Sequence, residues 1–532
     1  GLPLAIELAA ARVRVMTPAA IVERLGGALD VLASEEGGRP DRQATLRGAI
    51  TWSHDLLSFE HQVALRRLGV FAGGFTLEAA EAVLGESPAP WIDGLDAVAS
   101  LAEQSLIRAE DAPLGGTRYR MLETIRSFAQ ERLAGAGEDT PVHEAHGAWV
   151  GDLTRDIYLR VTGPEASHWL DLCELEHDNI RTALSWALAH HHTKLSVNIA
   201  DRNWRFWEIR GHYTEGRSWL ERCLAAFPDA SDRDRALLLD GLGNITWKQG
   251  DLVTAAEALT ASVAIWRAAG HKLALNAALS NLGAVQERMG NLDRAEELQR
   301  EALAIARELG DDQDISLTLN NLSTVLWNKG ELAQAREMLE ESIVIKRRDG
   351  NLFGLAVSLT NLAILAAQEG DLPRAIAHME EALGYDRQIG NRDGIADSLG
   401  NLASLVAETG DLARAAQLDG EALEIRQDLG DRVSLAYSLE SIGGTAARAE
   451  RWAEATQMFG AANALREQIS APLPPAETEK YESGLDLCRA GLSGESFDHA
   501  WATGRALGLE DATGLARRVA RAITAAEPPP SA

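Results

Sequence analysis

Four asparagines recur at one position of a repeating pattern, where their amide groups could recognise a ligand. They are Asn281, Asn321, Asn361 and Asn401, spaced 40 residues apart. Asparagine is roughly 0.5 kcal/mol less favourable than alanine inside a helix, so we expect a compensating interaction there. An amide donates and accepts hydrogen bonds at once, which suits it to hold the backbone of an extended peptide. Alternatively, each amide bonds to the adjacent repeat and fixes the stacking, and the two roles can coexist.

Side chains further along the same predicted helices vary in charge. They are Arg288, Asn328, Gln368 and Glu408. Because their charges differ, these side chains do not form a simple clamp for a carboxylate group. We therefore predict a peptide-binding groove lined by the four asparagines together with Arg288 and Asn328, and the identity of its ligand stays open.

Metal and redox chemistry find little support in the sequence. Cys173, Cys223 and Cys488 are far apart and have no metal-ligand spacing, which suits a reducing, cytoplasmic compartment. The histidines at 190–192 stand at a predicted helix end with no acid or cysteine at ligand spacing, and we expect them in a solvated turn. We predict no metal site.

Catalytic chemistry is not indicated either. No Gly-x-x-x-x-Gly-Lys-Ser/Thr loop is present, so the chain has no means of its own to cradle nucleotide phosphates. Glutamates such as Glu296, Glu297, Glu340 and Glu341 fall on polar helix faces beside Arg or Lys at i+3 or i+4, and we interpret them as solvated surface. We predict no catalytic residue, no cofactor and no enzymatic activity in this chain.

The elements that carry the asparagines are set by two glycine ladders. Gly250, Gly290, Gly330, Gly370 and Gly410 recur every 40 residues, and Gly270, Gly310, Gly350, Gly390 and Gly430 follow the same period with an offset of 20. Glycine fits the left-handed residue that closes a helix, and Asp or Asn after it caps the next helix. Each unit is therefore predicted to be helix, turn, helix, turn.

The apolar and small residues of these units agree with the glycines. Leucines fall at i and i+3 on the first helix of each unit, as at Leu319 and Leu322, and predict a one-sided core stripe. Small residues such as Gly283 and Ala295 recur where two helices must approach closely. This pattern resembles the tetratricopeptide repeat in its longer, kinesin-light-chain-like form. The resemblance implies a mainly α fold, a right-handed α-solenoid over residues 234–470 whose first helices line a concave groove.

The N-terminal third resembles a different module. Four segments follow each other in an order similar to the tail of the NB-ARC, or STAND, class of nucleotide-switched signalling ATPases. They are Gly1-Leu2-Pro3-Leu4, the segment around Trp52, Gly73-Gly74-Phe75, and Tyr119 to Arg126. The resemblance implies the end of a helical domain over 1–40, with Pro3 near the nucleotide. It also implies a small winged-helix domain with a short β-hairpin over 41–135. The family's Met-His-Asp triplet falls on Met121, Leu122 and Glu123, without the histidine that reads the phosphates.

The remaining segments complete the predicted organisation. We expect a helical linker with a divergent repeat-like unit over 136–233, and capping helices followed by a disordered tail over 471–532. The formal net charge of −28 disfavours nucleic-acid binding and anionic membranes. No apolar run long enough to span a bilayer is evident in the sequence, so we expect no membrane partner.

These observations predict a sensing segment of a nucleotide-switched bacterial signalling or transcriptional regulator. The repeats would bind a protein or peptide, and the winged helix would pass that event to an upstream nucleotide-binding domain. The absent phosphate loop and the start at Gly1 lead us to expect that domain, with ATP or ADP, earlier in the full-length protein, and a ligand-induced oligomer as one output. The alternative is a passive scaffold that joins proteins without switching.

Overall fold

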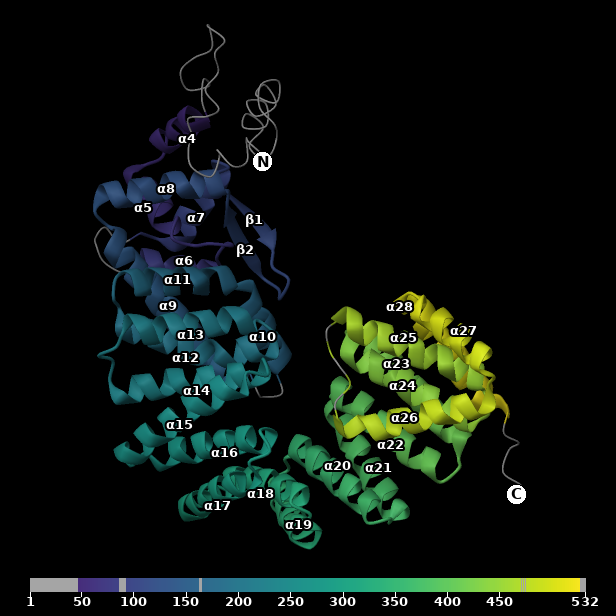
Figure 1. Cartoon of the computed structure of the whole chain (residues 1–532). Helices are drawn as coiled ribbons and strands as arrows, with labels where there is room; N and C mark the ends of the chain where they lie inside the picture. The colour runs from purple at the N-terminus through teal and green to yellow at the C-terminus, as the bar shows by residue number, and fades with distance from the viewer. Residues whose placement is uncertain are drawn as a thin grey trace. The chain divides into compact units, whose positions relative to one another are not determined.

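A computed structural model of the chain describes residues 46–85, 92–161, 165–469, 471, 473 and 475–526 (Figure 1). Pro3 and the domain expected over 1–40 lie outside the described residues. The chain divides into two compact units, Gly1–His271 and Lys272–Ala532. Each unit is described by itself.

The first unit begins with a small helical domain that carries a β-hairpin. Its elements are α4 (Leu46–Asp55), α5 (Phe59–Leu68), α6 (Leu77–Leu84), α7 (Gly94–Glu103), β1 (Ile107–Asp111), β2 (Thr117–Met121) and α8 (Glu123–Ala136). The two strands are antiparallel, with Ile107 opposite Met121 and Asp111 opposite Thr117. Phe75 and Phe128 are among the fully buried side chains of its core. Helices α5, α6 and α7, followed by the hairpin and α8, form the predicted winged-helix domain.

Antiparallel helices continue the first unit. They are α9 (Asp139–Arg160), α10 (Ala166–Leu175), α11 (His177–Ala189), α12 (Thr193–Ile209), α13 (Tyr213–Ala226), α14 (Asp232–Lys248) and α15 (Leu252–Ala269). The pair α12 and α13 corresponds to the divergent unit expected before the clear repeats. Trp207 and Trp219 are buried in its core with Trp204 packed against them, so these aromatic side chains serve packing.

Helix α15 corrects the expectation that no segment is apolar enough to span a bilayer. Among the described residues, it is the one helix long and apolar enough by length and composition. In the structure it pairs with α14: its Leu259 fills the space beside Gly243, and Trp266 Nε1 donates to Asp240 Oδ2 at 2.9 Å. A core helix of a repeat passes the same test of length and composition, so one such helix is weak evidence for a membrane span.

The second unit is a stack of helix pairs closed by three further helices (Figure 1). Its first and second helices alternate as α16 (Lys272–Arg288), α17 (Leu292–Leu309), α18 (Asp312–Asn328), α19 (Leu332–Arg348), α20 (Leu352–Gln368), α21 (Leu372–Ile389), α22 (Arg392–Glu408), α23 (Leu412–Leu429), α24 (Arg432–Arg448) and α25 (Trp452–Ile469). The closing helices are α26 (Pro475–Gly491), α27 (Gly494–Arg505) and α28 (Leu509–Ala526). Mainly α architecture with repeats is confirmed.

The glycine ladders have the predicted geometry. Gly330 and Gly370 end first helices with φ of +81° and +82°, and Gly310 and Gly390 end second helices with φ of +68° each. The degenerate copy of the motif places Glu450 in the same left-handed conformation, with φ of +60°. Only the backbone conformation requires glycine at Gly370, because a Cβ there would meet nothing within 4 Å.

Replacing Gly370 with alanine is therefore expected to destabilise the second unit by about 1 kcal/mol, the cost of a left-handed alanine. Gly384 is the matched control, since it lies in the interior of α21 and is equally free of neighbours within 4 Å. Gly384→Ala is expected to stabilise by about 0.5–1 kcal/mol through helix propensity. Thermal unfolding of both variants checks the pair, and equal shifts for both would contradict this explanation of the ladder.

The close approach expected at the small residues is also present. A Cβ on Gly283 would lie 2.5 Å from Gln299 Nε2, an atom that donates at 2.9 Å to the backbone oxygen of Ser280. Leu319 and Leu322 are fully buried, as the apolar stripe predicted. The first helix of each pair therefore presents leucines to the core and leaves its other side for the neighbouring repeats and solvent.

Exposed ion pairs follow the second helices from repeat to repeat. Arg307 pairs with Glu341, Arg347 with Glu381 and Arg387 with Glu421, each at 2.5–2.7 Å. Glu296 and Glu297 pair along their own helix as predicted, with Arg300 and Arg294. Glu340 and Glu341 pair instead with residues 34 positions away, because equivalent helices of neighbouring repeats lie side by side. Each such exposed pair stabilises by less than about 1 kcal/mol.

Candidate functional site

The four asparagines occupy one side of the first helices α16, α18, α20 and α22, which we call the first-helix face. Asn281, Asn321 and Asn361 are half-buried and Asn401 is exposed. Within the part of the chain that the structure describes, the amides of Asn281, Asn321 and Asn401 have no hydrogen-bond partner from another residue. These three amides are free to bond to a ligand.

Asn361 differs from the other three, because it is bonded to the preceding repeat. Its Nδ2 donates to Asn320 Oδ1 at 3.2 Å, and the same oxygen accepts from Ser358 Oγ at 3.0 Å. Ser358 in turn accepts from Lys346 Nζ at 2.7 Å, and burial lowers the pKa of this lysine to about 8. At this position the contacts favour the stacking role that the sequence left open.

The two further candidates, Arg288 and Asn328, also differ: one is exposed to solvent and the other contacts a neighbouring repeat. Arg288 is exposed at the end of α16. Asn328 Nδ2 donates to Glu287 Oε1 at 2.6 Å and so links α18 to α16. Trp327 Nε1 donates to Gln368 Oε1 one repeat further along. Polar contacts between neighbouring first helices therefore recur along this face.

Apolar side chains on the same face were not predicted. Leu317 is 51% exposed, Phe353 is 60% exposed and Val357 is 40% exposed. Leu317 and Val357 are 40 residues apart and hence equivalent in α18 and α20. Their period was visible in the sequence, but an apolar residue in an amphipathic helix is ordinarily assigned to the core. Exposed apolar groups beside free amides form a surface suited to a peptide with apolar side chains.

The first-helix face changes character toward α22 and α24. Asp393 and Glu408 are exposed on α22, which makes this part acidic. Beyond it, α26 packs across α24, and Lys480 Nζ of α26 donates to Ser404 Oγ of α22 at 2.7 Å (Figure 1). The part of the face left open in this unit therefore extends from α16 to α22.

A second feature is a buried polar joint within the first unit, formed where the β-hairpin meets the start of α11. Arg118 of β2 and Glu176, directly before α11, are 2% and 1% exposed. Arg118 Nη1 donates to Glu176 Oε1 at 2.5 Å and Nη2 to Oε2 at 3.1 Å. Two parallel bonds between a guanidinium and a carboxylate fix both groups in one orientation.

The loop of Gly73 and Gly74 completes this joint. Arg118 also donates to the backbone oxygens of Gly73 at 3.3 Å and Gly74 at 3.0 Å. Asn179 Nδ2 donates to Gly74 oxygen at 3.0 Å and to Glu176 Oε2 at 2.6 Å, while its Oδ1 accepts from the backbone N–H of Ala72 at 2.8 Å. A Cβ on Gly74 would lie 2.7 Å from the Tyr119 oxygen. Hairpin, loop and helix are thus held by one satisfied network.

The winged-helix domain lacks the charge of a phosphate-binding surface over α6 and α7. From Gly69 to Ile107 the sequence has no lysine or arginine and carries six acidic residues. Duplex binding depends on cations that neutralise phosphates. Met121, Leu122 and Glu123 stand at the turn from β2 into α8, where Glu123 is exposed and pairs with Arg126 at 2.7 Å.

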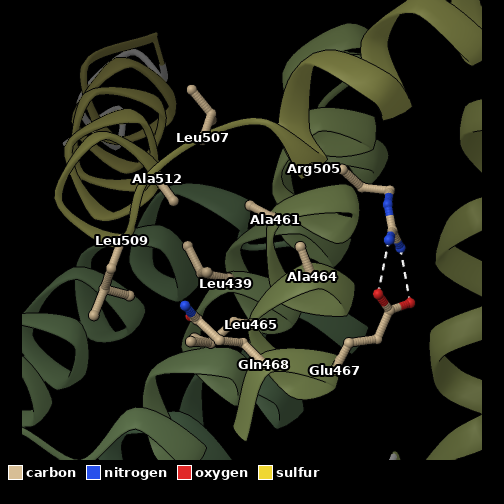
Figure 2. A pocket seen from close by; sticks show the side chains of 10 residues that line it. All are labelled: Leu439, Ala461, Ala464, Leu465, Glu467, Gln468, Arg505, Leu507, Leu509 and Ala512. Atoms are coloured by element: carbon tan, nitrogen blue, oxygen red, sulfur yellow. Dashed lines mark hydrogen bonds and ion pairs between the residues drawn. The ribbon is translucent and has the colours of Figure 1, made fainter.

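A cavity of about 460 Å³ lies in the second unit between α25 and the closing helices α27 and α28 (Figure 2). Leucines from three helices, Leu439, Leu465 and Leu509, contribute to its lining together with the polar side chains of Gln468, Arg505 and Glu467. Arg505 and Glu467 stand at its side and bond to each other through two contacts of 2.7 and 2.9 Å. Because these charges neutralise each other, the cavity offers no free charge to select a ligand, and we assign it to the packing of the cap.

Comparison with known families supports both modules. The model described as "Tetratricopeptide repeat" matches residues 274–348 and 354–428, and that described as "Winged helix-turn-helix domain" matches residues 57–134. The hairpin and helices α5 to α8 coincide with the second match, and α16 to α23 coincide with the first.

Two relatives in Mycobacterium tuberculosis share part of the sequence. A protein named "Putative HTH-type transcriptional regulator" is 38% identical over 224 residues, which cover 42% of this chain and 25% of the relative. A second, named "Uncharacterized protein", is 37% identical over 139 residues, covering 26% of this chain and 35% of the relative. The chain thus spans about a quarter to a third of the length of these relatives.

Among solved structures, a STAND protein with a tetratricopeptide repeat sensor from Pyrococcus horikoshii is similar at 16% identity, with a TM-score of 0.45 over 92% of this chain and 72% of that chain. Taken with the geometry above, the two family matches show what the chain is built from. It is a mainly α chain that combines a winged helix-turn-helix domain, with its β-hairpin, and tetratricopeptide repeats.

Proposed function

We propose that this chain is the sensing segment of a nucleotide-switched, STAND-type signalling or transcriptional regulator. The observation that carries the proposal is the buried joint of Arg118, Glu176 and Asn179, which ties the winged-helix hairpin to the first helices of the helical array. A passive scaffold does not need a fully satisfied charged network at that point. A sensor does, because a change in the array must reach the winged helix.

The ligand that best fits the first-helix face is an extended peptide, free or part of a protein. Its backbone would bond to the amides of Asn281, Asn321 and Asn401, and its apolar side chains would cover Leu317, Phe353 and Val357. A basic residue would suit the acidic end at α22, where Asp393 and Glu408 are exposed. This assignment uses binding chemistry only and requires no catalytic group in the chain.

The partner of the winged helix is inferred to be a nucleotide-binding domain of the full-length protein, with ATP or ADP as the cofactor there. The acidic charge of the sequence from Gly69 to Ile107 supports protein contact in place of DNA contact. A cytoplasmic location follows from this role, because the nucleotide is supplied there.

The ligand face is tested with a peptide selected from a displayed library on the purified chain. Asn321→Ala is expected to weaken its binding by about tenfold, the value of one to two hydrogen bonds. Its melting temperature should not fall, because Asn321 has no partner to lose and alanine favours the helix by roughly 0.5 kcal/mol. Asn361→Ala is the matched variant, and it is expected to lower stability by about 1 kcal/mol through its bond to Asn320. Undiminished binding by Asn321→Ala and Asn281→Ala together would show that the peptide binds elsewhere.

Switching is tested in the full-length protein by measuring ADP and ATP affinity with and without the selected peptide. A switch requires the peptide to change one nucleotide affinity relative to the other, by about 5- to 150-fold for typical coupling. Equal affinities in both conditions would support the passive scaffold instead.

A further inference from the structure

Two histidines and a carboxylate gather in the first unit at the corner where α10 meets α11 and the turn before α13. Glu174 belongs to α10, His177 begins α11, and His212 precedes α13. One ligand atom from each of these three residues lies within 4.8 Å of the other two. His177 and His212 have ring centroids 4.9 Å apart, and His212 Nε2 lies 3.1 Å from Glu174 Oε2.

The buried member of the group has an unused nitrogen. His177 is 5% exposed, and its Nε2 is buried without a hydrogen-bond partner among the described residues. Glu215 Oε1 lies 3.3 Å from that nitrogen, but Glu215 is already held by Arg181 at 2.5–2.7 Å and by Trp219 Nε1 at 3.2 Å. A buried polar atom without a hydrogen-bond partner costs about 1–3 kcal/mol. The same imidazole stands beside a second imidazole and a carboxylate, so the group indicates a missing ligand.

We propose that Glu174, His177 and His212 bind a divalent transition-metal cation, with zinc as the best match. Two imidazole nitrogens and one carboxylate oxygen form a ligand set that zinc uses at about 2.0–2.2 Å, with a fourth position left to water. A tetrahedral site of that size has ligand atoms about 3.4 Å apart, so the three side chains need to close by roughly an ångström. Glu215 stands next to the site as a further carboxylate that offsets the cation's charge.

The position of the site gives it a structural consequence. Glu176, which holds Arg118 in the joint, lies between Glu174 and His177 in the sequence. A bound cation would fasten the corner that carries Glu176 to the turn between α12 and α13. The site would thereby stiffen the helical side of the joint, independently of what the first-helix face binds.

The test uses the full chain without an affinity tag, stripped with EDTA and titrated with Zn²⁺ alone, with Co²⁺ as a spectroscopic probe. We expect one saturable Zn²⁺ site per chain and visible Co²⁺ absorption of a nitrogen-ligated site. His212→Gln, in a half-buried residue, and Glu174→Gln, in an exposed one, are each expected to weaken Zn²⁺ binding by at least about tenfold. His177→Asn is expected to do the same, with circular dichroism as the check that this buried variant folds.

His191→Gln is the matched control, because His191 belongs to the exposed turn of three histidines at 190–192. It should leave Zn²⁺ affinity unchanged. The proposal is overturned if the stripped wild-type chain shows no saturable Zn²⁺ binding, or if His212→Gln and Glu174→Gln bind as tightly as wild type. It is equally overturned if His191→Gln alone removes binding, which would assign the metal to the turn.

Discussion

Glu176→Ala is expected to destabilise the first unit by about 3–5 kcal/mol, because it leaves the charge of Arg118 buried without its partner. Both groups are almost fully buried and share two hydrogen bonds. The loss also removes an acceptor from Asn179, so the contact of that residue with the Gly74 loop is weakened. Chemical denaturation followed by tryptophan fluorescence measures the effect.

The same hairpin supplies the control. Arg120 and Glu110 pair at 3.2 Å, and each side chain is about half exposed. Glu110→Ala is therefore expected to change stability by less than about 1 kcal/mol. Similar small losses for Glu176→Ala and Glu110→Ala would mean that the joint is solvated in solution and does not couple the two modules.

Asp419→Asn is expected to stabilise the second unit above neutral pH by up to about 4 kcal/mol. Asp419 is 1% exposed, and burial raises its pKa to about 7, offset in part by hydrogen bonds from Ser441 and Thr445 and by the charges of Lys480 and Arg426. Its folded pKa lies above the unfolded value, so its contribution to stability is complete below about pH 4 and is lost as the pH rises toward 7. Asparagine keeps the shape without the charge.

The measurement is the denaturation midpoint of the second unit at pH 5 and pH 8, for wild type and Asp419→Asn. Wild type should lose stability from pH 5 to pH 8 because the buried carboxyl group of Asp419 ionises, and the variant should lose less. Asp393→Asn, at an exposed position of α22, is expected to behave like wild type. An Asp419→Asn variant less stable than wild type at pH 8 would show that the carboxylate is charged and usefully paired in the fold.

Local rules explain why the repeats could be predicted from the sequence. The left-handed turn at Gly370 needs glycine wherever it occurs, and the leucines at Leu319 and Leu322 face the core in every repeat. Period, turn chemistry and apolar stripe all depend on residues within one helix pair. The helix boundaries of the repeats followed from the same local signals, whereas the winged-helix hairpin was expected from the family resemblance.

The joint and the metal cluster could not be predicted, because their members come from separate elements. Arg118 and Glu176 are 58 residues apart, and an arginine in a hairpin is ordinarily exposed. Glu174 and His177 lie 35 or more residues before His212 in the sequence. A search for cysteines or for neighbouring histidines at metal-ligand spacing therefore does not find this site. Contacts of this kind depend on how helices stack, which a single sequence does not specify.

The four asparagines of the first-helix face show the same limit of prediction from sequence. Equal spacing made Asn281, Asn321, Asn361 and Asn401 equivalent, yet Asn361 bonds to Asn320 while the other three have free amides. The partner of Asn361 is the residue that precedes the asparagine of the preceding repeat. That position holds serine, asparagine, threonine or glycine in successive repeats. Asn320 accepts there from Asn361, whereas Ser280 contacts Thr318 of the next first helix.

Hydrogen–deuterium exchange of the chain with and without the selected peptide tests the central claim most directly. If binding on the first-helix face is passed to the winged helix, exchange should slow in α18 and α20 and should also change at residues 72–76 and 107–121, the loop and hairpin of the joint. Changes confined to α16 through α22, with the joint unaffected at saturating peptide, would contradict the sensor and leave a scaffold.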